Sequence, residues 1–190
     1  MQSQQHFHTV TDSQDGVFNS YTGKLINLYQ PTEDMIQIQD IGSALSKICR
    51  FGGHSSLFYS VAQHSVLVAA LCGDELPKEA LMHDAAEAYL GDVIKPLKII
   101  LGAGYADLEA SFEAVISAKF GLASGKLIKA RIKKYDLMAL DLEHKAFIMR
   151  QPAQLLVAMN SLDLIKDDQY AWSSELAKMA FLSRYGELFS

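Results

Sequence analysis

The sequence predicts an all-α fold, and three observations support this prediction. From Asp40 to the end of the chain, apolar residues recur with the spacing of helices rather than of strands. The segments between these periodic stretches are short, which favours helices packed together as a compact bundle. The 190 residues suffice for one domain with its own hydrophobic core. We therefore expect a flexible lead-in at residues 1–20 and a single domain at residues 21–190.

Two segments before the helices have strand character, Lys24–Tyr29 and Met35–Gln39, and together they predict a short N-terminal β-hairpin. Asp40 suits the N-cap of a first helix, Ile41–Arg50, which the Gly52-Gly53 pair ends. Further helices are expected at Tyr59–Cys72, Lys78–Leu90, Pro96–Leu101, Ala106–Phe120, Gly125–Met149, Pro152–Ile165 and Glu175–Tyr185.

Charge and hydropathy limit the classes of partner. The net charge of −5 argues against binding to a nucleic acid polymer or an anionic membrane, because a polyanion would be repelled on average. A small anionic substrate in a locally basic pocket remains compatible with this charge. No apolar run is long enough to span a bilayer, and Met1 to Asn19 lacks the apolar stretch of a signal peptide. We therefore expect a cytoplasmic protein.

Four side chains with metal-ligating chemistry fall on three predicted helices. His83 and Asp84 are adjacent, so on a helix their side chains project about 100° apart and both can reach one ion. His64 lies on the apolar stripe of the preceding helix, and Asp136 shares a partly apolar stripe with Leu140. Two imidazoles and two carboxylates would satisfy one another around one divalent cation. The alternative interpretation is a set of unrelated buried ion pairs.

The order His64, His83-Asp84, Asp136 resembles the metal-binding pattern of the HD-domain phosphohydrolases. The run HDAAEAYLGD, residues 83–92, followed by VIKPLK, is similar to bacterial 5′-deoxynucleotidases and to small phage-type deoxynucleoside triphosphohydrolases. The run ICRFGGHSSLFYSVAQHS, residues 48–65, adds to this resemblance, which extends from about Thr22 to Glu143. It implies an HD-domain helical bundle.

The resemblance also implies roles for individual residues. The metal ligands would be His64, His83, Asp84 and Asp136. Glu87 and Asp92 would position or activate the attacking water. Glu87 lies four residues after His83, so it shares that helix face whether or not the family is invoked. The alternative for both carboxylates is a position on an exposed helix surface.

The implied cofactor is one divalent metal ion, which could be Mn, Co, Zn, Mg or Fe. The absence of histidine between Asp84 and Asp136 favours a mononuclear hydrolytic site over the binuclear sites of related enzymes. A second ion carried in by the substrate phosphates is an alternative.

Positive charge for a phosphate is expected from three residues. Lys133 precedes Asp136 by one helical turn, and Arg50 and Lys98 occupy positions that the family uses for phosphate contacts. His54 has three open assignments: it could contact substrate, cap a helix or order its loop.

The predicted function is metal-dependent phosphohydrolysis of (deoxy)nucleotides, as a dNMP 5′-nucleotidase or a dNTP (for example dATP) triphosphohydrolase. Both branches share the run at residues 83–92, so the sequence leaves the phosphate count open. The resemblance further implies a homo-oligomer, dimer or higher. The alternative function is a catalytically inactive HD module that binds nucleotide or a partner protein.

Overall fold

Helix α2 (Val61–Cys72) is the central element of the computed structural model, which describes residues 16–164 and 169–190. Its sequence, VAQHSVLVAALC, carries no Asp, Glu, Lys or Arg, and such a helix is stable only where other elements cover it on all sides. It packs against α3 (Pro77–Met82), α7 (Lys126–Glu143) and α9 (Ser174–Phe189). The position of α2 therefore fixes His64 inside the core.

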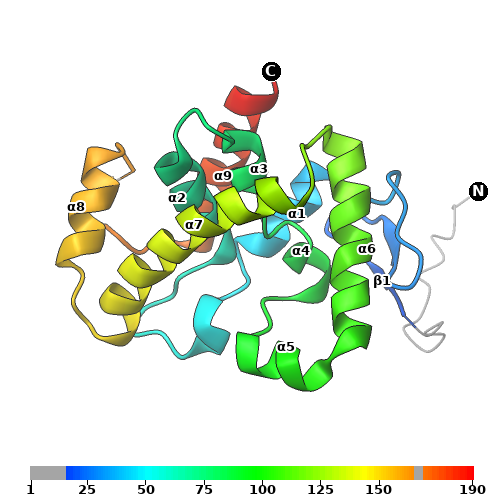
Figure 1. Cartoon of the computed structure of the whole chain (residues 1–190), viewed down its shortest axis with the longest axis horizontal. Helices are drawn as coiled ribbons and strands as arrows, with labels where there is room; N and C mark the ends of the chain where they lie inside the picture. The colour runs from blue at the N-terminus through cyan, green and yellow to red at the C-terminus, as the bar shows by residue number, and fades with distance from the viewer. Residues whose placement is uncertain (1–15, 165–168) are drawn as a thin grey trace, which may run out of the picture.

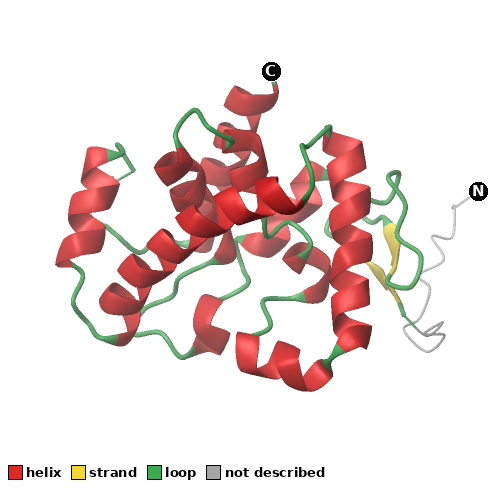
Figure 2. Cartoon of the chain, viewed as in Figure 1, coloured by secondary structure: helices red, strands yellow, loops and turns green. Residues whose placement is uncertain are grey.

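Helix α6 lies beside the hairpin at one side of the molecule, and α8 lies at the other (Figures 1 and 2). The elements other than α2, α3, α7 and α9 are, in chain order, β1 (Val17–Asn19), β2 (Leu25–Asn27), α1 (Ile38–Leu45), the 3-10 turn η1 (Arg50–Gly53), α4 (Glu87–Leu90), α5 (Lys95–Leu101), α6 (Ala103–Phe120), the π-helical turn η2 (His144–Ile148) and α8 (Ala153–Ser161). The predicted mostly helical fold with a small N-terminal hairpin is confirmed. Within the part of the chain that the structure describes, no helix is both long and apolar enough to cross a membrane.

The first helix and the long helix both end earlier than predicted. Helix α1 ends at Leu45, and Arg50 belongs to η1. Helix α7 ends at Glu143, after which the chain continues with the wider hydrogen bonding of η2 rather than as α-helix to Met149. The helix predicted at Pro152–Ile165 also ends early, at Ser161, and its predicted last residue, Ile165, lies outside the described residues.

The predicted third helix, Lys78–Leu90, is wrong as one continuous element. It is divided into α3 and α4 by a turn at residues 83–86. The backbone hydrogen bonds there are of the tighter three-residue kind, from Ala85 N to Met82 O and from Glu87 N to Asp84 O, both 3.0 Å. His83 and Asp84 therefore lie in a tight turn, and the directions of their side chains do not follow the 100° spacing of a regular α-helix.

The predicted hairpin has one correct strand and a wrong partner. Leu25–Asn27 lies inside the predicted segment, but it pairs antiparallel with Val17–Asn19, which had been assigned to the lead-in. The connection is a tight turn in which Gly23 has a φ of +82°, a conformation that glycine adopts without strain. Met35–Gln39 forms instead a turn and the first residues of α1. Residues 1–15 of the predicted lead-in lie outside the described residues.

The prediction that Asp40 is the N-cap of the first helix is wrong. Asp40 is a buried residue in the first turn of α1. Its carboxylate accepts hydrogen bonds from the backbone N–H of Thr22, at 2.6 Å, and from the Thr22 hydroxyl, at 2.9 Å. The side chain thus ties the hairpin connection to the helical body.

We expect Asp40→Ala to lower the free energy of unfolding by about 1–3 kcal/mol, because the backbone N–H and the hydroxyl of Thr22 lose a charged acceptor. Chemical denaturation would measure the change. Asp34→Ala is the control, since Asp34 only accepts from the nearby Thr32 hydroxyl on an exposed turn and its loss should cost less than about 0.5 kcal/mol. Equal losses from the two variants would contradict the role given to Asp40.

Candidate metal centre

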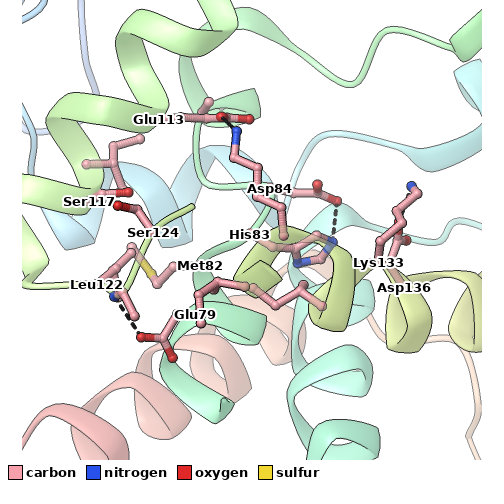
Figure 3. A pocket seen from close by; sticks show the side chains of 16 residues that line it. Glu79, Met82, His83, Asp84, Glu113, Ser117, Leu122, Ser124, Lys133 and Asp136 are labelled. Atoms are coloured by element: carbon pink, nitrogen blue, oxygen red, sulfur yellow. Dashed lines mark hydrogen bonds and ion pairs between the residues drawn. The ribbon is translucent and has the colours of Figure 1, made fainter. Parts of the chain in front are cut away.

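Three of the four predicted metal ligands, His64, His83 and Asp84, come together in the structure, and the fourth, Asp136, lies beside His64. His64 comes from α2, His83 and Asp84 from the turn between α3 and α4, and Asp136 from α7. The two Nε2 atoms of His64 and His83 are 3.3 Å apart. Asp84 Oδ2 lies 3.1 Å from His83 Nε2 and 3.5 Å from His64 Nε2, and Asp136 Oδ1 lies 3.3 Å from His64 Nε2. Figure 3 shows His83 and Asp84 in contact, with Asp136 beside them.

These separations suit a shared cation. Metal–ligand bonds of about 2.0–2.2 Å place neighbouring ligand atoms roughly 3–3.5 Å apart. The ligand atoms of His64, His83 and Asp84 all lie within 4.8 Å of one another, so this group could hold a metal ion. Asp136 is not part of this group of three, and it approaches the group through His64, whose Nε2 lies 3.3 Å from Asp136 Oδ1.

The hydrogen bonds of the other ring nitrogens support this assignment. His83 Nδ1 donates to the carbonyl oxygen of Ala80 at 2.8 Å, and His64 Nδ1 donates to Glu143 Oε1 at 2.6 Å. Each bond leaves the lone pair on Nε2, the arrangement usual for metal-binding histidines. Two such lone pairs and two carboxylate oxygens then face one another, and they repel unless a proton or a cation lies between them. The donor set therefore fits a divalent cation.

The pKa values of the cluster reflect the close contact between its histidines and its carboxylates. Burial and Arg50 oppose a proton on His64, but Glu143 and Asp136 outweigh them and raise the pKa of His64 to about 9. Burial also opposes ionisation of Asp84 and Asp136, yet neighbouring positive charge and hydrogen bonds hold both pKa values well below their usual range, mainly through His83 for Asp84 and His64 for Asp136.

Glu143 is the residue of this site that the sequence analysis missed. Its carboxylate is fully buried and accepts hydrogen bonds from His64 Nδ1, from the Tyr59 hydroxyl at 2.9 Å and from Arg50 Nε at 3.2 Å. A signal was present, because Glu143 follows Asp136 by seven residues and so shares its face of α7.

Arg50, predicted to bind phosphate, is buried beside the cluster. Its Nε donates to Glu143, and its Nη1 is 3.7 Å from Asp84 Oδ2. In the structure it therefore balances the charge of two carboxylates, and its contact with phosphate stays a prediction.

Glu87 lies near these ligands and is buried, not exposed on a helix surface. Its Oε1 is 3.6 Å from Lys98 Nζ, while its Oε2 has no hydrogen-bond partner among the described residues. Burial and then the charges of Asp84 and Asp92 raise the pKa of Glu87 to about 10. Lys98 Nζ also donates to Glu109 at 2.6 Å. Lys98, which was predicted to contact phosphate, is therefore already paired with a carboxylate in the structure.

Asp92 is partly buried, and burial raises its pKa although Arg50 opposes the shift. His54, by contrast, is exposed at the end of η1. Within the described residues, no hydrogen bond or ion pair joins its side chain to the metal cluster.

A cavity of about 240 Å³ opens beside the ligands. His83, Asp84, Asp136 and Lys133 line it together with apolar side chains, among them Met82, Ile116 and Ile132 (Figure 3). The Lys133 ammonium pairs with Asp136 and is largely exposed, and its predicted contact with phosphate stays a prediction.

Comparisons with known proteins give two relatives. The chain is 44% identical over 126 residues to the uncharacterized protein YfdR of Escherichia coli, an overlap of 66% of this chain and 69% of YfdR. It is 36% identical over 133 residues to an uncharacterized protein of Rhodobacter capsulatus, over 64% of this chain and 68% of that protein. No known family model matches the sequence. The chain belongs to the same protein family as these two relatives.

We expect the protein to bind a divalent ion such as Mn²⁺, Co²⁺ or Zn²⁺, and Asp84→Ala to abolish this binding by removing a central ligand. At a free ion concentration 100 times Kd, binding should stabilise the fold by about 2.7 kcal/mol. Titration calorimetry and thermal unfolding would measure both effects. His54→Ala is the control and should bind as the wild type does; unchanged binding by Asp84→Ala would contradict the assignment.

Proposed function

We propose that this member of the YfdR family is a metal-dependent phosphohydrolase that acts on (deoxy)nucleotides. The observation that carries the proposal is the convergence of His64, His83, Asp84 and Asp136 from three parts of the chain, with the buried carboxyl of Glu87 close by. Ligands alone would suit a structural metal, whereas an additional carboxyl with an unpaired oxygen suits a reaction.

The charge around the ligands supports a phosphorylated substrate. Lys133 lines the cavity next to Asp136, and its exposed ammonium can move from that carboxylate to an incoming phosphate. When bound, a divalent cation at this site would polarise a phosphate oxygen and lower the pKa of a water molecule. The cavity adjoins the ligands directly, so the rest of a substrate has space there.

Glu87 is the residue proposed to handle the proton of the attacking water. Its Oε2 is buried without a partner among the described residues, which leaves one oxygen available for that water. Asp92 adds a second carboxyl near Glu87, and the Lys98 ammonium lies 3.6 Å from Oε1, where its charge restricts the orientation of the Glu87 carboxyl. Lys98 is thereby proposed to orient Glu87 as well as to meet phosphate charge.

The nucleotide assignment rests on the resemblance of residues 83–92 to deoxynucleotide-hydrolysing enzymes. The apolar side chains Met82, Ile116 and Ile132 of the cavity suit a base or sugar, whose faces are largely apolar. The competing proposal is a module that binds nucleotide or a partner protein without turnover. Such a module would differ from the hydrolase in binding its ligand without forming a product.

We expect inorganic phosphate or triphosphate to be released from at least one deoxynucleoside mono- or triphosphate when Mn²⁺, Co²⁺, Mg²⁺ or Zn²⁺ is supplied. A monophosphate would give nucleoside and phosphate, and a triphosphate would give nucleoside and triphosphate. Chromatography of the products would distinguish them. Metal binding without turnover of any nucleotide in the panel would contradict hydrolysis and favour the binding module.

We expect Glu87→Gln to lower kcat by about 100- to 10,000-fold, since the amide cannot exchange a proton with water. Metal affinity should be retained, because Glu87 is not among the ligands. Steady-state kinetics and metal titration on the same preparation would measure both quantities. Glu187→Gln, an exposed carboxylate of α9 paired with Arg184, is the control. Full activity of Glu87→Gln would remove Glu87 from the mechanism.

A further inference from the structure

We infer that Glu143 is a positioning residue, which fixes the ring of His64 for metal binding and links it to Arg50 and Tyr59. The inference rests on the metal site of the proposed function and is independent of the substrate. Glu143 contacts neither the cavity nor the converging ligand atoms, so it acts through His64.

The hydrogen bonds of Glu143 leave little freedom to the histidine. Its Oε1 accepts from both His64 Nδ1 and the Tyr59 hydroxyl, while Oε2 accepts from Arg50 Nε. Both oxygens are therefore held from different directions, by α2, by η1 and by the segment before α2. A carboxylate fixed in this way orients the imidazole plane and keeps the proton on Nδ1.

The two histidines are held by partners of different charge. His83 Nδ1 donates to a neutral carbonyl, that of Ala80, whereas His64 Nδ1 donates to a carboxylate. A carboxylate partner makes the opposite nitrogen a stronger electron donor. His64 should therefore be the stronger nitrogen ligand, and the loss of charge at Glu143 should weaken metal binding even where the hydrogen bond survives.

Stability alone does not account for a charged residue at this position. Glu143 and Arg50 are both buried, and a buried ion pair commonly contributes no more than apolar side chains of similar size would. What apolar side chains would not supply is an acceptor for His64 Nδ1. Arg50 offsets the cost of burying Glu143, and its Nη1 remains near Asp84, so the same guanidinium supports one ligand directly and another through Glu143.

The decisive variant is Glu143→Gln. Its amide oxygen can still accept from His64 and Tyr59, so the variant removes the charge while it preserves the shape. We expect Kd for Mn²⁺ or Co²⁺ to rise about 10- to 100-fold, measured by titration on protein shown to be folded by circular dichroism. The visible absorption of bound Co²⁺, which reports ligand geometry and strength, should change as well. Asp141→Asn, an exposed carboxylate of the same helix, is the matched control.

In the single variant the buried Arg50 loses its nearer carboxylate partner, which could unfold the protein, so Arg50→Gln/Glu143→Gln is included to remove both charges together. The double variant should show the same weakened metal binding. A wild-type protein that binds no metal would defeat the proposed function. The inference would be overturned if the wild type bound metal and either folded variant showed the same Kd and the same Co²⁺ spectrum. If the variants differed from the wild type only in a lower unfolding temperature of the metal-free protein, Glu143 would be merely structural.

Discussion

A deficit of positive charge in the core is the constraint on which the rest of the site depends. The largely buried carboxylates Asp84, Asp136 and Glu143 contribute three negative charges around His64, and Arg50 is the buried guanidinium that opposes them. With neutral histidines these four groups sum to −2. The exposed Lys133 ammonium paired with Asp136 offsets part of this charge from outside the core, and a divalent cation can balance what remains. In its absence the raised pKa of His64 supplies only one proton. Uncompensated charge in a core is costly, so this balance favours occupancy by a divalent ion.

The fold meets this constraint by placing an uncharged helix at its centre. Because α2 has no charged residue except its histidine when protonated, neighbouring elements can bring acidic groups to His64 without competing cations. Helix α7 contributes Asp136 and Glu143 from one face, and they contact opposite nitrogens of the same ring. The imidazole is thereby clamped between the two carboxylates. The turn before α4 then adds His83 and Asp84 from a third direction.

The side chains of the candidate metal cluster could be predicted from the sequence, whereas their surroundings could not. His64 and Asp136 stood on apolar stripes, and periodicity identifies which faces are buried. No glycine or proline between Lys78 and Leu90 indicates that the helix is interrupted at His83, so this interruption depends on tertiary packing. The partner of β2 was missed because Val17–Asn19 is too short to show alternation. Burial of Arg50 could not be foreseen, since its partner Glu143 lies 93 residues away.

The positions of Glu87 and the cavity bear on the direction of the proposed reaction. The cavity lining includes Lys133 and Asp136, but neither Glu87 nor Asp92 is part of it. Displacement at phosphorus requires the attacking and leaving oxygens to lie roughly in line on opposite sides. A water held by Glu87 would therefore attack from outside the cavity, and the leaving nucleoside would depart into it. The proposed mechanism therefore assigns selection of the leaving group to the cavity, and to Glu87 and Lys98 a role toward any phosphate presented at the ligands.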